Sequence, residues 1–353
     1  MEKSYSIYNT DYIQLGRQVL NQLNVPSRHA EIVMENLLDS DKKGIYTHGF
    51  YRLDTYIQQI KRGNINPNPK ITKVKDHLNI KLLDGDDGFG YVVSQYAMEE
   101  AIAISENRGV GVVGVRKSNH FGAAAYYAEM AAMRNQIGIV MTNASPAIAP
   151  TGSLKPVLGN NPWSISIPTH LGYPITLDIA NSVSARGKIR LKALNGESIP
   201  LGWALNENGE PTTDAEEALK GVILPIGDYK GYGITLMIDI LTGVLTGAKF
   251  GNQVPLVDQD GKRNNGHLFI SLDIKAFMEL SEFKDRVDEL IKIVKSAPKI
   301  REEIDILLPG EREWQTKLSQ EQDKVKLPER IFNFIHALST EYHLPLPKNE
   351  LLI

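Results

Sequence analysis

Two histidines, an arginine and a tyrosine are the side chains whose types and spacing favour acid–base chemistry on an anion. His120 lies in KSNHFGAAAYYAEMAA, between polar residues and an alanine-rich run that predicts a helix. Ser118 and Asn119 are of N-cap type, so we expect His120 at the mouth of that helix. The positive end of the helix dipole would keep the imidazole neutral and able to accept a proton. The alternative is a histidine that only caps its own helix.

A second group occurs in THGFYRLDTY, where His48, Arg52 and Tyr56 follow one another at intervals of four residues. On a helix this spacing places the three side chains on one stripe. A guanidinium between an imidazole and a phenol suits bidentate binding of a carboxylate. The alternative is an ordinary solvated helix face.

A third group is GDYKGYG, residues 227–233, in which Lys230 and Gly231 precede a long apolar helix. An ammonium group and nearby backbone N–H groups can bind an anion there, although a glycine-rich turn is the alternative. The segments VLGNNPWSI and LDIANSVSARGK place glycine, asparagine and serine beside apolar strands, where ligand-binding loops often occur.

The segment GVGVVG, residues 109–114, matches the dinucleotide pattern G-x-G-x-x-G only in its letters. In that pattern the glycines follow a strand and open a helix. Here they lie inside a β-branched run, and VRKSNH follows in place of a helix. We therefore predict a buried strand and expect any nucleotide to bind through another architecture.

The segments that must position these residues show two kinds of sequence pattern. The first seventy residues, and those from about Arg312, show helical periodicity. Between them, apolar strands such as VGVVGV and IGIVMTNA alternate with helices, which is typical of a sheet covered on both faces. We expect an α/β, mixed α+β chain with a discontinuous helical domain (1–72 and 312–353) and a mixed α/β cofactor-binding and catalytic domain (73–311).

The composition excludes several classes of protein. The chain has 353 residues, 42% hydrophobic and 23% charged, and its net charge of −3 gives no basic field for nucleic acid. It has no cysteine, which excludes disulfides, thiolate metal sites and cysteine nucleophiles. The N-terminus has no apolar signal region, and no run of 18 apolar residues occurs, so we expect a cytoplasmic protein without membrane contact.

Taken together, these segments resemble one family. THGFYRLDTY, KSNHFGAAAYYA, SPAIAPTG, LGNNP, LDIANSVSARGK, GEPTTD, DYKGYG and LLPGERE are similar, in this order, to segments of the malate/L-lactate dehydrogenase-like oxidoreductases. That family includes malate, sulfolactate and ureidoglycolate dehydrogenases, and diketogulonate and imino-acid reductases. The resemblance implies a nicotinamide-binding fold that is not Rossmann, NAD or NADP as cofactor, and a homodimer with active sites near the subunit interface.

The resemblance also implies roles for single residues. His120 is the general acid/base, while Arg52, His48 and Tyr56 hold a small carboxylate substrate, with Arg263 near it. The implied cofactor-binding residues are Ala144, Asp178, Ile179, Ala180, Lys230, Gly231, Gly310, Glu311 and Arg312. Many relatives have a glycine where this chain has Ser153, and GTNP where it has GNNP, so the local pocket differs.

The implied reaction transfers hydride between nicotinamide and a 2-hydroxy or 2-oxo acid, with malate favoured because the family is named for it. Ureidoglycolate, L-lactate and sugar acids remain alternatives within the family. A non-catalytic protein that binds a nucleotide or sugar acid is a more remote one. A metal-dependent lyase or hydrolase using His48 and His120 ranks lower still, and we expect no metal, because no H-x-x-x-H or H-E-x-x-H spacing occurs.

Overall fold

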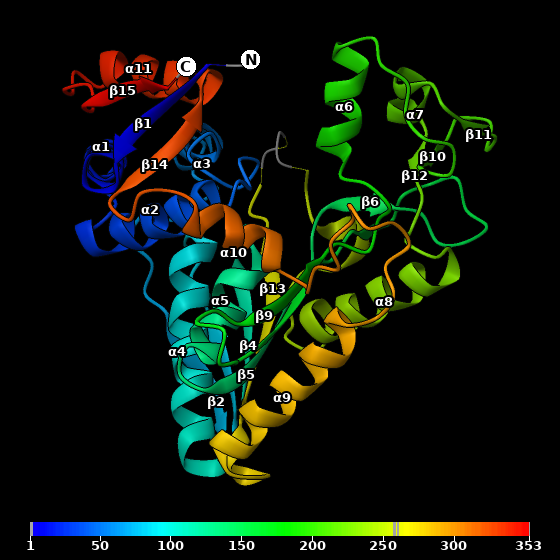
Figure 1. Cartoon of the computed structure of the whole chain (residues 1–353). Helices are drawn as coiled ribbons and strands as arrows, with labels where there is room; N and C mark the ends of the chain where they lie inside the picture. The colour runs from blue at the N-terminus through cyan, green and yellow to red at the C-terminus, as the bar shows by residue number, and fades with distance from the viewer. Residues whose placement is uncertain (1–2, 257–258, 260, 353) are drawn as a thin grey trace.

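A seven-stranded sheet forms the centre of the chain in the computed structural model, which describes residues 3–256, 259 and 261–352 (Figure 1). Its order is β2-β3-β4-β13-β5-β8-β9, and all neighbours are antiparallel except the parallel pair β3 and β4. The apolar runs expected to be strands are confirmed as strands. The strands are β2 (Thr72–His77), β3 (Ile80–Asp84), β4 (Val110–Ser118), β5 (Gln136–Thr142), β8 (Trp163–Ile167), β9 (Ile175–Ile179) and β13 (Asn265–Asp273).

Helices cover both faces of this sheet, as expected. The helices α4 (Gly90–Arg108) and α5 (Ala124–Ala132) pack on β4, β5, β8 and β13. The helix α8 (Tyr229–Asp239) continues as the π-helix η1 (Ile240–Val244), which packs on β13 and β4. Gly111 of β4 contacts α4, whereas Gly114 contacts Thr246, just beyond η1. Residues at odd spacing along a strand point to opposite faces, so the two helix layers lie on opposite sides.

The segment GVGVVG is confirmed as part of a strand. Gly109 ends α4 in the left-handed region, with φ of 80°, and Val110 to Gly114 belong to β4. No helix begins at Gly114. The glycines allow the sheet to approach α4 closely, because a Cβ on Gly111 would lie 2.0 Å from the carbonyl oxygen of Ala101.

The two ends of the chain lie together and share an apolar core, which we call the terminal unit (Figure 1). It contains the expected helices and, in addition, a three-stranded sheet β14-β1-β15 that the sequence analysis did not predict. Phe89, Tyr91 and Val92 of the central part also belong to this core, so the division at residues 72 and 312 stays a prediction. The elements are β1 (Ser4–Tyr8), α1 (Asn9–Gln22), α2 (Ser27–Lys42), α3 (Arg52–Lys61), β14 (Lys324–Pro328), α11 (Glu329–Glu341) and β15 (Asn349–Leu352).

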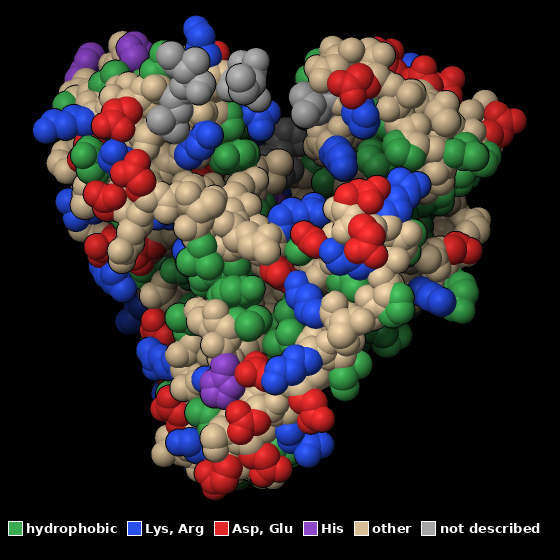
Figure 2. Space-filling model, viewed as in Figure 1, with side chains coloured by type: hydrophobic (Ala, Val, Ile, Leu, Met, Phe, Trp, Pro, Cys, Tyr) green, Lys and Arg blue, Asp and Glu red, His purple; other side chains and the backbone are tan. Residues whose placement is uncertain are grey.

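A smaller outer lobe has a core of its own. In Figure 2 the outer lobe and the terminal unit form two projections with a notch between them, and acidic and basic side chains are interspersed on this face. The helices of the outer lobe are α6 (Arg186–Leu194) and α7 (Ala215–Lys220). The second sheet of the chain has the order β11-β10-β12-β6-β7. These strands are β6 (Pro146–Ile148), β7 (Leu158–Gly159), β10 (Ala204–Leu205), β11 (Pro211–Thr212) and β12 (Val222–Ile223).

Four shorter or more peripheral elements complete the fold. They are the 3₁₀ turns η2 (Gly251–Gln253) and η3 (Ile274–Ala276), and the helices α9 (Leu280–Lys295) and α10 (Glu311–Leu318). Within the described residues, no helix has the length and apolar character needed to cross a bilayer.

Candidate active site

His120 lies in the loop between β4 and α5, and the expectation that it opens the helix is wrong. Ser118 is the last residue of β4 and pairs with Asn265, so it is in a strand and not in an N-cap position. Gly122 then adopts φ of 84°, and the helix begins only at Ala124. The sequence predicted the strand before His120 and the helix after it, but not the left-handed turn at Gly122 that delays the start of the helix.

The imidazole of His120 is held by two buried phenols. Its Nδ1 shares a hydrogen bond of 2.8 Å with the hydroxyl of Tyr56, which is also 2.8 Å from the hydroxyl of Tyr91. This chain of contacts leaves Nε2 as the ring nitrogen without a hydrogen-bond partner among the described residues. Tyr56 therefore orients His120, and Tyr91 is a site residue that sequence reasoning missed.

His48 lies beside His120, with ring centroids 5.7 Å apart and the rings nearly parallel. The expected single helical stripe is only partly correct, because α3 begins at Arg52 and His48 lies in the turn before it. The side chain of Arg52 bends back, and its Nε donates to the carbonyl oxygen of Thr47 at 2.8 Å. The turn still brings His48, Arg52 and Tyr56 to the same place as His120.

A second guanidinium reaches the site from the segment before β13. Arg263 is only 7% exposed, and its Nη2 donates to Ser145 Oγ at 2.8 Å, while its Nε donates to Asn265 Oδ1 at 3.2 Å. In the described part of the chain, neither Arg52 nor Arg263 forms an ion pair with a carboxylate. A buried guanidinium held only by neutral acceptors retains its full positive charge for a ligand.

Burial and the positive charges around His120 keep its imidazole neutral. Burial lowers the pKa of His120 well below its usual range, and Arg52, His48 and Arg263 lower it further. Burial and then Arg52 lower the pKa of His48 to about 4. Burial lowers the pKa of Arg263 to about 10. The common cause is positive charge gathered in a water-poor site, which favours an anionic ligand.

A cavity of about 510 Å³ adjoins His48. That volume is in the range of small-molecule and cofactor sites. It contains four of the expected cofactor residues, Asp178, Ile179, Ala180 and Gly310, along the end of β9 and the start of α10. The cavity is lined by Lys43, Ile45, His48, Gly122, Ala123, Ala124, Ala125, Glu129, Asn160, Pro162, Thr176, Leu177, Asp178, Ile179, Ala180, Ala185, Pro309, Gly310 and Glu313.

Asp178 has the properties expected of a residue that binds a polar ligand. One carboxylate oxygen accepts from the backbone N–H of Ala125 at 3.2 Å, at the first turn of α5. Burial raises the pKa of Asp178 to about 6. Its other oxygen has no hydrogen-bond partner among the described residues, so it can accept from a hydroxyl of a ligand.

The other expected cofactor residues lie outside this cavity. The backbone N–H of Ala144 donates to Asn161 Oδ1 at 2.9 Å. Gly231 is buried against the carbonyls of Ile226 and Asn181, beside a second, shallower depression. Lys230 is exposed at the start of α8.

The residues after Gly310 also point elsewhere. Glu311 is buried and accepts from Lys295 Nζ at 2.5 Å and from the backbone N–H of Leu308 at 2.7 Å. Arg312 is exposed. Glu313 is the residue of α10 that lines the cavity.

One wall of the cavity is a buried ion network that the sequence did not reveal. Lys43 Nζ lies 2.8 Å from Asp39 and 2.6 Å from Glu129, and it lies over the ring of Trp314. Although burial opposes its charge, Asp39 and Glu129 raise the pKa of Lys43. These residues come from α2, α5 and α10, and no local pattern relates them.

Within the described residues, no group of three or more histidine, cysteine, aspartate or glutamate side chains could hold a metal ion. The site combines an oriented imidazole, two guanidiniums and an adjoining cavity that is lined by the carboxylate of Asp178.

Comparison with known proteins identifies the family. A family model described as malate/L-lactate dehydrogenase matches residues 8–336. The chain belongs to this family. L-sulfolactate dehydrogenase of Methanothermobacter thermautotrophicus is 40% identical over 340 residues, 96% of this chain and 98% of the relative. Malate dehydrogenase of Pyrococcus abyssi is 41% identical over 307 residues, 85% of this chain and 84% of the relative.

Solved structures agree with this assignment. The sulfolactate dehydrogenase from Methanocaldococcus jannaschii superposes with a TM-score of 0.90 at 38% identity, covering 97% of this chain and 98% of the other. The predicted family and the non-Rossmann fold are therefore confirmed.

The cofactor class follows from the family. Relatives named for their cofactor are ureidoglycolate dehydrogenase (NAD(+)) of Escherichia coli and (2R)-3-sulfolactate dehydrogenase (NADP(+)) of Chromohalobacter salexigens. They are 34% and 31% identical over 79% and 92% of this chain, and over 80% and 95% of their own lengths. The chain is an NAD(P)-dependent dehydrogenase that acts on hydroxy acids.

Proposed function

We propose that the substrate is a 2-hydroxy acid with two anionic groups, such as malate or its sulfonate analogue sulfolactate. The observation that carries this proposal is the pair of guanidiniums of Arg52 and Arg263. Both lower the pKa of His120, and neither has a carboxylate partner among the described residues. The expected arginine–carboxylate contact needs only one of them, and the second favours a second anion. Relatives named for malate and for sulfolactate support this choice.

The chemistry of the chain's own residues follows from the geometry. In oxidation, neutral His120 accepts the proton of the substrate hydroxyl at Nε2, while Nδ1 remains bonded to Tyr56. Arg52 and Arg263 hold the two anionic groups and fix the reacting carbon. The nicotinamide cofactor supplies hydride transfer when bound. Asp178, Ile179, Ala180 and Gly310 would hold it in the adjoining cavity.

A substrate panel with both NAD and NADP tests this proposal. We expect malate or sulfolactate to exceed L-lactate and ureidoglycolate in kcat/KM. Arg263→Gln should lower kcat/KM for the dianion about tenfold or more, roughly 1.4 kcal/mol, and should change that for lactate much less. Equal losses for mono- and dianionic substrates would place Arg263 outside the binding of the second anion.

We also propose that the chain forms a homodimer in the cytoplasm. Exposed apolar side chains on one stretch of α8 and η1 support the dimer: Met237, Ile240, Val244 and Leu245 are 54%, 41%, 52% and 66% exposed. Light scattering of the purified protein should give twice the mass of 39.3 kDa. A monomer at micromolar concentration would contradict the dimer, and cell fractionation tests the location.

A further inference from the structure

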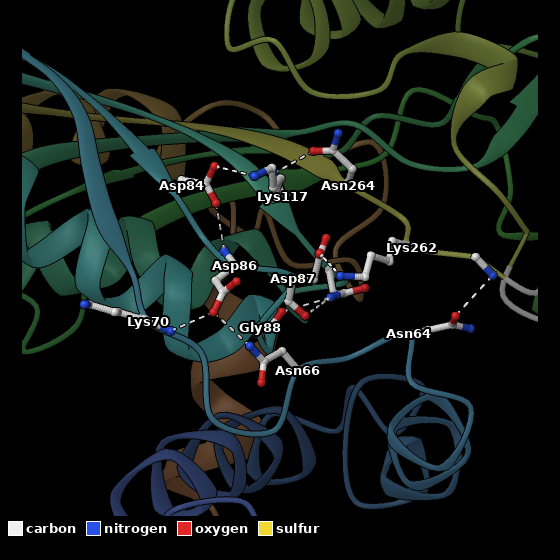
Figure 3. Close-up of polar contacts among 12 residues, drawn as sticks. Asn64, Asn66, Lys70, Asp84, Asp86, Asp87, Gly88, Lys117, Lys262 and Asn264 are labelled. Atoms are coloured by element: carbon white, nitrogen blue, oxygen red, sulfur yellow. Dashed lines mark hydrogen bonds and ion pairs between the residues drawn. The ribbon is translucent and has the colours of Figure 1, made fainter.

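Among the described residues, no carboxylate pairs with Arg263. The segment that carries it is nevertheless held by contacts before and after it in the chain. Before it, the backbone N–H of Gly261 donates to Asn64 Oδ1 at 3.1 Å, and Lys262 Nζ pairs with Asp87 at 2.6 Å. After it, Asn264 Oδ1 accepts from the backbone N–H of Lys117 at 2.6 Å. Figure 3 shows Lys262 against Asp87 in the turn that follows β3, with the contacts of Asn64 and Asn264 apart from that turn.

That turn, Gly85–Gly88, is built as a rigid support. Asp86 and Asp87 are consecutive non-glycine residues with φ of 52° and 54°, a conformation that persists only where the surroundings impose it. The carboxylate of Asp86 accepts from the side chain of Asn66 at 2.8 Å and from the backbone N–H of Lys70 at 3.0 Å. The neighbouring Asp84 pairs with Lys117 at 2.9 Å.

Asp87 contacts the active-site segments at both of its ends. Its carboxylate, 9% exposed, binds Lys262, the residue before Arg263. Its backbone carbonyl accepts from the side-chain amide of Asn119 at 2.8 Å, and Asn119 is the residue before His120. The same amide also donates to the carbonyl of Gly88 at 2.9 Å. One residue therefore lies between the segment of the acid/base histidine and the segment of the second guanidinium.

We propose that Asp87 is a positioning residue, which through Lys262 sets the place of Arg263 relative to His120. This inference rests on the proposed role of Arg263 toward the second anion of the substrate. The carboxylate of Asp87 is buried, whereas Lys262 is mostly exposed. The fixed partner is therefore Asp87, and the ion pair holds Lys262 against the turn. An arginine bound only to neutral acceptors depends on such a tether for its position.

The test compares two variants that break the same contact from opposite sides. Lys262→Gln changes an exposed side chain and should fold normally, and Asp87→Asn keeps the size and the backbone contacts of the turn. In both, we expect KM for malate or sulfolactate to rise about threefold to tenfold with kcat within about twofold, since a misplaced arginine weakens binding of the dianion. Lys262→Arg keeps the positive charge that pairs with Asp87 and should therefore keep the wild-type KM.

Asp84→Asn is the matched control. It removes the ion pairs that the last residue of β3, next to the turn, forms with Lys117 and Arg116, but it does not remove the pair that holds Lys262. We expect its KM to stay near wild type. An equal rise in KM in this control would show a general loss of turn structure and overturn the assignment to Asp87.

The double variant separates this inference from the proposed function. On an Arg263→Gln background, Asp87→Asn should have no further effect on KM. If Arg263→Gln raises KM for the dianion but Lys262→Gln and Asp87→Asn do not, the positioning role is wrong and the proposed function stands. If Arg263→Gln itself changes nothing, the proposed second-anion site is wrong.

Discussion

The imidazole of His120 shares its surroundings with two guanidiniums and a second imidazole, so binding of a dianion must change its proton affinity. Negative charge placed between Arg52 and Arg263 favours imidazolium, and the pKa of His120 therefore rises from its lowered value toward neutrality. We predict that binding of a 2-oxo dianion to the complex with reduced cofactor takes up as much as one proton near neutral pH. Calorimetry in two buffers that differ in ionisation enthalpy measures this uptake, and His120→Gln should abolish it.

The phenols behind His120 have a role that can be tested separately. Burial raises the pKa of both Tyr56 and Tyr91, so both stay neutral and act as hydrogen-bond donors and acceptors. Tyr91→Phe removes one hydrogen bond from the chain and should lower kcat about twofold to tenfold, in line with roughly 0.5–1.5 kcal/mol for a hydrogen bond. The KM for cofactor should not change. An unaltered kcat would mean that Tyr56 alone orients the histidine.

At the scale of the element, the glycines of β4 allow helices to pack closely on both faces of the strand. A side chain at Gly111 would meet the backbone of α4, whereas a Cβ at Gly114 would lie 3.3 Å from a methyl group of Thr246. We predict that Gly111→Ala lowers the free energy of unfolding by about 1–3 kcal/mol and that Gly114→Ala costs less. Urea unfolding measures both. Fluorescence titration should show unchanged cofactor affinity, and a selective loss of affinity would restore a phosphate-binding role for GVGVVG.

The strands and helices were predictable from sequence where apolar periodicity is local, as in β4 and β5. The strand β1 was not, because its partners lie at the other end of the chain: the nearby contact from Asn9 to Gln322 spans 313 residues. The site was predictable to the same degree. Motif spacing indicated His48, Arg52, Tyr56 and His120. The contact of Tyr56 with Tyr91 depends on packing between α3 and α4, which no spacing encodes.

At the scale of the whole molecule, Lys43 joins α2 of the terminal unit to α5 of the central part. Lys43→Met leaves Asp39 and Glu129 with less positive charge near them, and the loss of one partner of a buried pair costs about 3–5 kcal/mol. Burial already raises the pKa of Glu129, and without Lys43 the pKa values of both carboxyls rise further, so the variant loses more stability than the wild type as pH increases. We predict a larger loss of unfolding free energy at pH 8 than at pH 5.

Denaturant unfolding at the two pH values measures this loss. Lys317→Met is the control, because its side chain is 30% exposed, Asp39 is its ion-pair partner among the described residues, and it too lies over the ring of Trp314. Its cost should be smaller and should depend less on pH. A pH-independent loss in Lys43→Met would mean that the lysine contributes by packing on Trp314 and not by its charge.

The middle strand of the three-stranded sheet also determines when the enzyme becomes active during its synthesis. The strand β1 leaves the ribosome long before its two neighbours, β14 and β15, are made. At roughly 5–20 residues per second, the nascent β1 waits about 15–60 s for its partners. Until then the residues Ile7 and Tyr12, fully buried in the finished protein, have no complete core to enter. Because α3 packs in this core, we expect Arg52 and Tyr56 to reach their places only when it closes, so that a ribosome stalled before residue 324 carries a chain without a working substrate site.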